Sequence, residues 1–114
     1  MNLTVRDHAT AFVVAPTGRI DHGSADPFLL ALQEMIPTCT QGSRPLILDF
    51  SAVQYISSAG LRSLMVAARQ IKTAGGRIGI AGPQPLVREV FAIARFELVV
   101  PCFEDVDAAA RSLA

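Results

Sequence analysis

The sequence lacks several features that mark common protein classes. Its 114 residues include no tryptophan and one tyrosine, and ten basic residues balance ten acidic ones. Without net charge or a run of like charge, the chain has no field that would concentrate nucleic acid or an anionic membrane surface around it. We therefore expect no nucleic-acid partner.

Long hydrophobic runs are also missing. Apolar residues make up 51% of the chain, yet no run approaches the ~18 to 20 apolar residues that a membrane span needs. At the N-terminus, Asn2, Thr4 and the polar residues 6–8 stand where a signal peptide would place its apolar block. We expect a cytoplasmic protein without a membrane partner.

Cysteine is scarce, with Cys39 and Cys102 lying far apart and without CxxC spacing. Two cysteines and two distant histidines do not readily supply the ligands of a zinc site. We expect both thiols to be structural, and we expect no metal and no other cofactor.

The first half of the chain predicts two strands, a helix and a third strand. Residues 3–6 and 11–15 are rich in β-branched residues and are expected to form a hairpin. A helix capped by Ser24 should run until Pro37 stops it, followed by a polar loop over residues 38–44. The unbroken apolar run at residues 46–50 is typical of a central strand covered on both faces.

The second half predicts three more helices and two more strands. A helix over residues 58–74 should end at Gly75-Gly76, followed by a strand at residues 77–81 and, later, a strand at residues 98–100. The intervening helix has an expected apolar face of Leu86, Val90, Phe91, Ile93 and Ala94, and a C-terminal helix has one of Val106, Ala109, Ala110 and Leu113.

This order of elements indicates an α/β fold. Right-handed crossovers would give a mixed, largely parallel sheet of about five strands with about four α-helices packed beside it. Ligands and partners of such sheets gather at the carboxyl ends of the parallel strands. The turn that contains Ser57 and Ser58 should lie there.

Those two adjacent hydroxyls, between a strand and a helix, are the most informative feature of the sequence. One interpretation is ordinary capping, in which Ser57 accepts a hydrogen bond from an early helical N–H. Ser58 would then be the first helical residue, with its hydroxyl projecting from the turn. A phosphate at this position would be favoured by the free N–H groups and the positive end of the helix dipole, which suggests a switch more than a catalyst.

The run LDFSAVQYISSAGL at residues 48–61 resembles the signature of the STAS domain of bacterial anti-sigma-factor antagonists. Residues 17–25 (TGRIDHGSA) match a second family element. Gly75-Gly76, the following strand and Pro83-Gln84-Pro85 match a third. The resemblance covers nearly the whole chain and implies that residues 1–114 form one STAS domain with a STAS-like α/β fold.

The resemblance implies an anti-anti-sigma factor that binds an anti-sigma factor serine kinase and so frees a sigma factor. In the family this kinase phosphorylates the serine before the small residue and Gly, here Ser58, and a metal-dependent serine/threonine phosphatase reverses the change. This sequence departs from the common pattern because Ser57 stands where an acidic residue usually precedes the phosphoserine. Ser57 is therefore a second candidate for phosphorylation.

The expected partner-binding residues surround this turn. The family match assigns kinase contacts to the segment after the second strand. The outer face of the helix that begins at Ser58 would extend the surface. The set is Asp21, His22, Ser24, Ser57, Ser58, Ala59, Arg62, Val66 and Arg69. Asp21 is equally well explained as a turn residue that bonds its own backbone, and the helix face as a merely solvated one. Asp49 and Ser51 are expected to be turn and capping groups.

Two other functions stay open at this point. A STAS module can serve as an assembly subunit of a stress-signalling scaffold or of a membrane-associated transport complex, without a phosphate cycle. A small serine hydrolase is more remote, because the sequence lacks the first glycine of G-x-S-x-G and both histidines precede the serine. We expect no enzymatic activity, and a weak homodimer is compatible with the sequence.

Overall fold

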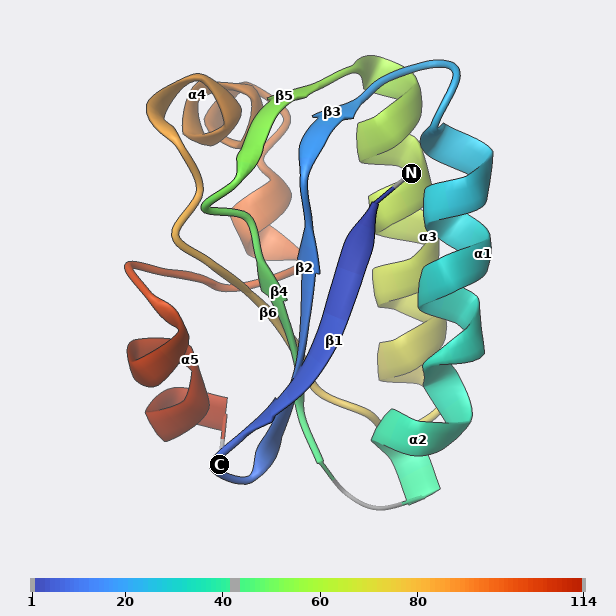
Figure 1. The fold of residues 1–114 in the computed structure, drawn as a ribbon, viewed down its shortest axis with the longest axis vertical. Coiled ribbons are helices and arrows are strands. Elements are labelled where there is room, and N and C mark those ends of the chain that lie inside the picture. Colours follow the sequence, from blue (N-terminus) through green and yellow to red (C-terminus); the bar gives the residue numbers. More distant parts are fainter. Residues whose placement is uncertain (1, 42–43, 114) are drawn as a thin grey trace.

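The computed structural model describes residues 2–41 and 44–113, apart from the side chains of residues 39–41. Its centre is a five-stranded sheet of order β1-β2-β4-β6-β7 (Figure 1). The strands are β1 (Leu3–His8), β2 (Ala11–Pro16), β4 (Leu46–Asp49), β6 (Ile78–Ala81) and β7 (Cys102–Phe103). Only the β1–β2 pair is antiparallel among these neighbours. The predicted hairpin and the largely parallel sheet are therefore confirmed.

Helices cover both faces of this sheet. α1 (Ala25–Glu34) and α3 (Ser58–Thr73) lie side by side on one face, and α5 (Val106–Leu113) lies on the opposite face (Figure 1). α4 (Pro85–Ile93) packs at the end of the molecule where β5 lies. This arrangement is the STAS-like α/β architecture that the sequence predicts.

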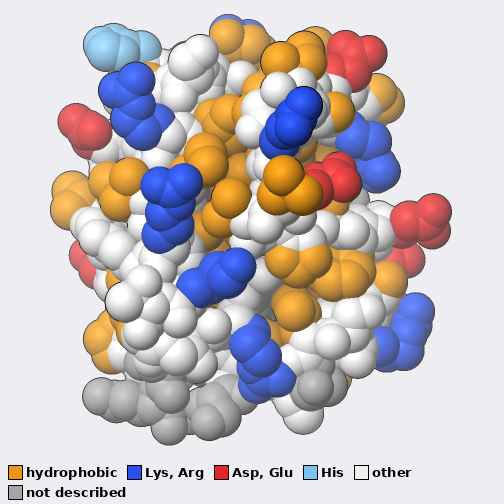
Figure 2. Space-filling model, turned by 180° about the vertical axis from the view of Figure 1, so that it is seen from behind, with side chains coloured by type: hydrophobic (Ala, Val, Ile, Leu, Met, Phe, Trp, Pro, Cys, Tyr) orange, Lys and Arg blue, Asp and Glu red, His pale blue; other side chains and the backbone are white. Residues whose placement is uncertain are grey.

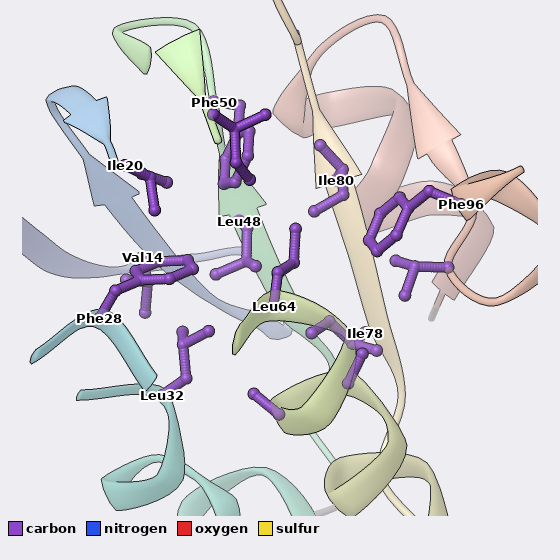
Figure 3. Packing of buried hydrophobic residues seen from close by; sticks show 14 of the residues in the cluster. Val14, Ile20, Phe28, Leu32, Leu48, Phe50, Leu64, Ile78, Ile80 and Phe96 are labelled. Atoms are coloured by element: carbon purple, nitrogen blue, oxygen red, sulfur yellow. The ribbon is translucent and has the colours of Figure 1, made fainter. Parts of the chain in front are cut away.

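The main core fills the space between the sheet and the helices α1 and α3. Figure 3 shows Phe28 and Leu32 of α1 and Leu64 of α3 directed toward Leu48 of β4, and all four side chains are fully buried. A smaller cluster forms under α5, where Ala109 packs with residues of β2, β4 and β6. Since both faces of β4 are covered, its run Leu46-Ile47-Leu48 is apolar without alternation, as expected of a central strand.

A second, two-stranded parallel sheet was not predicted. It pairs β3 (Gly18–Ile20) with β5 (Val53–Ile56) and lies beyond the main sheet toward the start of α3 (Figure 1). Both strands are short, and neither was predicted as an element of its own. Gly18 has a φ of +86°, which suits glycine, and its N–H donates to the carbonyl of Ala52 at 2.9 Å.

The predicted stop at Pro37 is wrong. α1 already ends at Glu34, and a short helix α2 (Ile36–Gln41) follows it, with Pro37 as its second residue. Proline is tolerated in a first helical turn because the N–H that it lacks has no intrahelical partner there. Most of the expected loop at residues 38–44 is therefore helical, while residues 42–43 lie outside the described part.

The predicted face of α4 is also wrong in part. Val87 and Phe91 are fully buried, whereas Leu86 and Ile93 are 51% and 85% exposed. Two apolar stripes overlap on this helix, and the stripe with the large aromatic ring is the buried one. The Phe91 ring lies 4.5 Å from that of Phe96 and 5.9 Å from that of Phe50, measured between centroids.

The strand expected at residues 98–100 does not form. Leu98, the first residue of the expected strand, instead ends a 3₁₀ helix (Phe96–Leu98) and is 80% exposed. The edge strand β7 begins only at Cys102. Arg95 enters this turn with a φ of +55°, and the buried ring of Phe96 anchors it. The three apolar residues 98–100 therefore do not share one buried environment.

The structure agrees with a structural role for Cys102. Its side chain is half-buried against the main core, and burial, with a contribution from the Glu97 carboxylate, raises the pKa of the thiol to about 12. The side chain of Cys39 lies outside the described part. Among the described side chains no cluster suits a metal ion, and none of the described helices has the length and apolar character of a membrane span.

The packing of α4 predicts different effects for two matched substitutions. Val87→Ala should lower the free energy of unfolding by about 2 kcal/mol, because it leaves a cavity against the core. Ile93→Ala, on the exposed side, should change it by less than about 0.5 kcal/mol. Urea denaturation of both variants measures the difference, and a larger loss for Ile93→Ala would mean that α4 packs by the other stripe.

Candidate functional site

The turn between β5 and α3 uses its two serines differently. Ser57 is the N-cap of α3, with extended backbone, and its Oγ accepts a hydrogen bond from the Gly60 N–H at 3.1 Å. The Ser57 N–H donates to the carbonyl of Ile20 at 2.9 Å. Ser57 is therefore committed to holding the start of the helix, as the sequence predicts for a capping serine.

Ser58 is the first residue of α3, and it is exposed. Within the described part of the chain, its hydroxyl makes no side-chain hydrogen bond. This is the projecting geometry that the sequence predicts for Ser58. The neighbouring hydroxyl of Ser57 caps the helix, so of the two serines at the N-terminus of α3 only Ser58 has a free hydroxyl.

Gly60 permits the close approach of α3 to β3. A Cβ at this position would lie 2.6 Å from the carbonyl oxygen of Ile20 and 2.8 Å from its Cγ2. Real Cβ atoms do not come so close to backbone, so a larger residue would push the helix away from the strand. The missing side chain of Gly60 thus allows the contact with Ile20 that fixes the start of α3, where Ser58 lies.

Asp21 is the centre of the turn that follows β3. Its Oδ1 accepts hydrogen bonds from the N–H groups of Gly23 at 3.1 Å and Ser24 at 3.3 Å. Ser24 occupies the N-cap position of α1 but does not cap it as expected. Its Oγ instead accepts from the Asp21 N–H and lies 3.0 Å from the Arg19 carbonyl, to which it donates. The turn-forming interpretation of Asp21 therefore describes what this carboxylate does in the isolated chain.

Arg19 and Tyr55 complete this region and were missed by the sequence analysis. The Arg19 guanidinium lies 4.4 Å from the centroid of the Tyr55 ring, and its Nε is 3.7 Å from Oδ2 of Asp21. A cation over an aromatic face is attracted by the ring quadrupole. The contact depends on the pairing of β3 with β5, so no local signal in the sequence reveals it.

Arg62 lies between two hollows on the α3 side of the molecule. One is lined by His22, Ala25, Asp26, Ala59, Arg62 and Ser63, and the other by Ser58, Leu61, Arg62, Met65, Val66 and Arg69. Every partner-binding residue predicted from the sequence, apart from Asp21, Ser24 and Ser57, lines one of the two. Asp21 and Ser24 belong to the turn that contains His22 and precedes Ala25, and Ser57 directly precedes Ser58. The predicted residues therefore lie together on one side of the molecule.

The surface of the second hollow mixes cationic and apolar groups. Val66 is 38% exposed, and Leu61 and Met65 are half-buried although their spacing places them on the core side of the helix. Figure 2 shows Lys and Arg side chains gathered beside hydrophobic ones on this side of the molecule. Such a surface suits a protein partner that carries acidic and apolar groups.

The other motif residues have supporting contacts. Asp49 Oδ1 accepts from the Ser51 N–H at 3.0 Å, which is the turn role expected of both residues. His8 lies in a separate hollow, where its Nε2 is 2.6 Å from Oδ1 of Asp107. Ser58 does not line that hollow.

The two serines should differ in their effect on stability. Ser57→Ala should lower the free energy of unfolding by about 1 kcal/mol, because the Gly60 N–H loses its acceptor. Ser58→Ala should change it by less than about 0.5 kcal/mol, because no side-chain contact is lost. Thermal and urea denaturation test this pair, and equal losses would contradict the assignment of Ser57 as the only capping hydroxyl.

Comparisons with known proteins agree with the fold. A protein of Bordetella bronchiseptica with the provisional name anti-sigma factor antagonist BtrV is 36% identical over 77 residues. The match spans 68% of this chain and 66% of that protein, just under two thirds of its length.

Solved structures share the fold. An anti-sigma factor antagonist from Mycobacterium paratuberculosis superposes with a TM-score of 0.85 at 22% identity, covering 98% of this chain and 92% of that one. The Bacillus cell fate determinant SpoIIAA, in its phosphorylated form, gives 0.69 at 18% identity, covering 97% and 99%. The family model of the STAS domain matches residues 1–109. The chain therefore belongs to the STAS domain family.

Proposed function

We propose that this protein is an anti-sigma factor antagonist controlled by phosphorylation of Ser58. In its unmodified form it binds a cognate anti-sigma factor that is a serine kinase, and a sigma factor is released. The observation that carries the proposal is the exposed Ser58 hydroxyl on the first turn of α3, beside a serine already used as the cap. The provisional name of the Bordetella relative and the phosphorylated form of the Bacillus protein support it.

The proposed contact surface consists of the turn and the two hollows beside it. Asp21, His22 and Ser24 form one part, Ser57, Ser58 and Ala59 the centre, and Arg62, Val66 and Arg69 the other part. The small side chain of Ala59, next to Ser58, leaves room for a partner's backbone to approach the hydroxyl. Arg62 and Arg69 favour acidic groups on the partner, and Val66 with its half-buried neighbours supplies apolar area.

Phosphate on Ser58 would act mainly on the partner. The group adds about −1.5 to −2 charges. At the N-terminus of α3 this charge is tolerated, with a gain of about 0.3–1 kcal/mol. A partner packed over the turn would instead have to desolvate a dianion, which costs several kcal/mol unless matching cations are present. The second effect is larger, so the modified protein should dissociate.

The phosphate cycle needs two partners. In the forward step Ser58 Oγ bonds to the γ-phosphorus of ATP, the bond from that phosphorus to the bridging oxygen breaks, and ADP leaves. The hydroxyl proton passes to a base of the kinase or to solvent. A metal-dependent serine/threonine phosphatase hydrolyses the ester, so that water supplies the new oxygen and inorganic phosphate is released.

A hydrolytic role for Ser58 is less well supported by the geometry. His8 is engaged with Asp107 in a hollow that Ser58 does not line, and His22 lines the hollow between α1 and α3 together with Ala59 rather than Ser58. A base within hydrogen-bond reach of the nucleophile is what such chemistry requires. The switch needs only an accessible hydroxyl.

Binding to an anti-sigma kinase encoded in the same genome tests the proposal. The unmodified protein should be retained by the immobilised kinase without ATP and should be released after incubation with ATP. Ser58→Ala should stay bound under both conditions, because the phosphoacceptor is missing. Ser58→Asp should bind at least about tenfold more weakly, since a carboxylate supplies part of the repulsive charge.

Ser57→Ala is the matched control. It should still be released on incubation with ATP, because its hydroxyl caps the helix and does not accept phosphate in the proposal. Equal retention of all four proteins with and without ATP would overturn the model. Incorporation of the protein into a large particle or a membrane complex, measured by light scattering after size-exclusion chromatography, would instead favour a role as an assembly subunit.

A further inference from the structure

We propose that Arg62 is the intramolecular partner of the phosphate on Ser58. The inference rests on the proposed phosphorylation and adds to it a specific side chain of this chain that receives the new charge. The two residues are four positions apart on α3. Side chains with this spacing are neighbours on one face of a helix, with Cβ atoms about 5–6 Å apart.

The direction of the Arg62 side chain suits this contact. Helical side chains lean toward the N-terminus of their helix, so that of Arg62 covers the turn from which Ser58 projects. Ser58 and Arg62 are both exposed, and both line the same hollow of about 300 Å³ on α3. Phosphate oxygens on Ser58 would therefore be within reach of the guanidinium without any change of the backbone.

Arg62 is also available. Within the described residues, Arg6 pairs with Asp49, Arg44 with Asp7 and Arg19 with Asp21, and Lys72 donates to the carbonyl of Val99. The side chain of Arg62 has no ion pair and no hydrogen bond to any described residue. Asp26 and His22 line the hollow on its other side, yet neither is paired with it. A phosphate would thus not have to displace an existing partner.

The order of the two charges is the favourable one. An acidic group at position i with a basic group at i+4 stabilises a helix more than the reverse order. The planar fork of arginine matches two phosphate oxygens at once, which lysine does not do. One modification then changes two groups of the contact surface, because it adds a dianion at Ser58 and withdraws the Arg62 cation from an acidic partner.

The second pKa of the phosphate reports this pairing. Phosphoserine is introduced at position 58 by genetic encoding, and its phosphorus resonance is followed against pH by NMR in the isolated protein. Arg62 favours the dianion, so Arg62→Gln should raise the second pKa by about 0.3 unit or more. Arg62→Lys should raise it less. Arg69→Gln, two turns along the same hollow, is the matched control and should leave it unchanged.

Asp26, His22 and Arg69 also face this region, but they are the same in the parent and in Arg62→Gln, so the difference isolates Arg62. An unchanged pKa in Arg62→Gln would overturn the inference, and so would an equal rise in Arg69→Gln. The measurement needs neither kinase nor partner. A failure of the proposed switch in binding experiments is therefore distinguishable from a failure of the Arg62 contact.

Discussion

The close contact between the start of α3 and the end of β3 determines the rest of the site. The carbonyl of Ile20 accepts the Ser57 N–H at 2.9 Å, and Gly60 leaves room for that same carbonyl where a Cβ would meet it at 2.6 Å. With the helix held there, Ser57 is turned inward to cap it and Ser58 is turned outward. The contact depends on β3 and β5, a pair of short strands that add nothing to the main sheet but place both segments next to each other.

This contact places the proposed switch on the surface of a helix that is packed into the core. The Ser58 hydroxyl sits on the first turn of α3, a helix whose Leu64 and Ile71 are fully buried in the main core. We propose that phosphorylation acts locally, through its charge and bulk at the surface that includes Arg62, Val66 and Arg69. We propose that Arg62 makes a contact in both the unmodified and the phosphorylated protein. It faces an acidic partner when Ser58 is free and the phosphate when Ser58 is modified.

Much of this could be predicted from the sequence, for identifiable reasons. The central strand at residues 46–50, the helix that begins at Ser58 and the capping hydrogen bond of Ser57 were each predicted correctly, because each rests on a strong local pattern. α4 has two overlapping apolar stripes, and only the stacking of Phe91 on Phe96 decides between them. The pair β3–β5 was missed because each strand is too short to show a period. The Arg19–Tyr55 contact depends on that pairing, so local sequence does not reveal it.

The central claim is that Ser58 carries a phosphate in the living cell. Intact-mass and peptide mass spectrometry of the protein, isolated from its native cells across growth conditions, tests this most directly. The account predicts a fraction heavier by about 80 Da, with the added mass on Ser58 and not on Ser57, and with an abundance that changes with conditions. Protein without added mass under every condition, or with the phosphate only on Ser57, would contradict it.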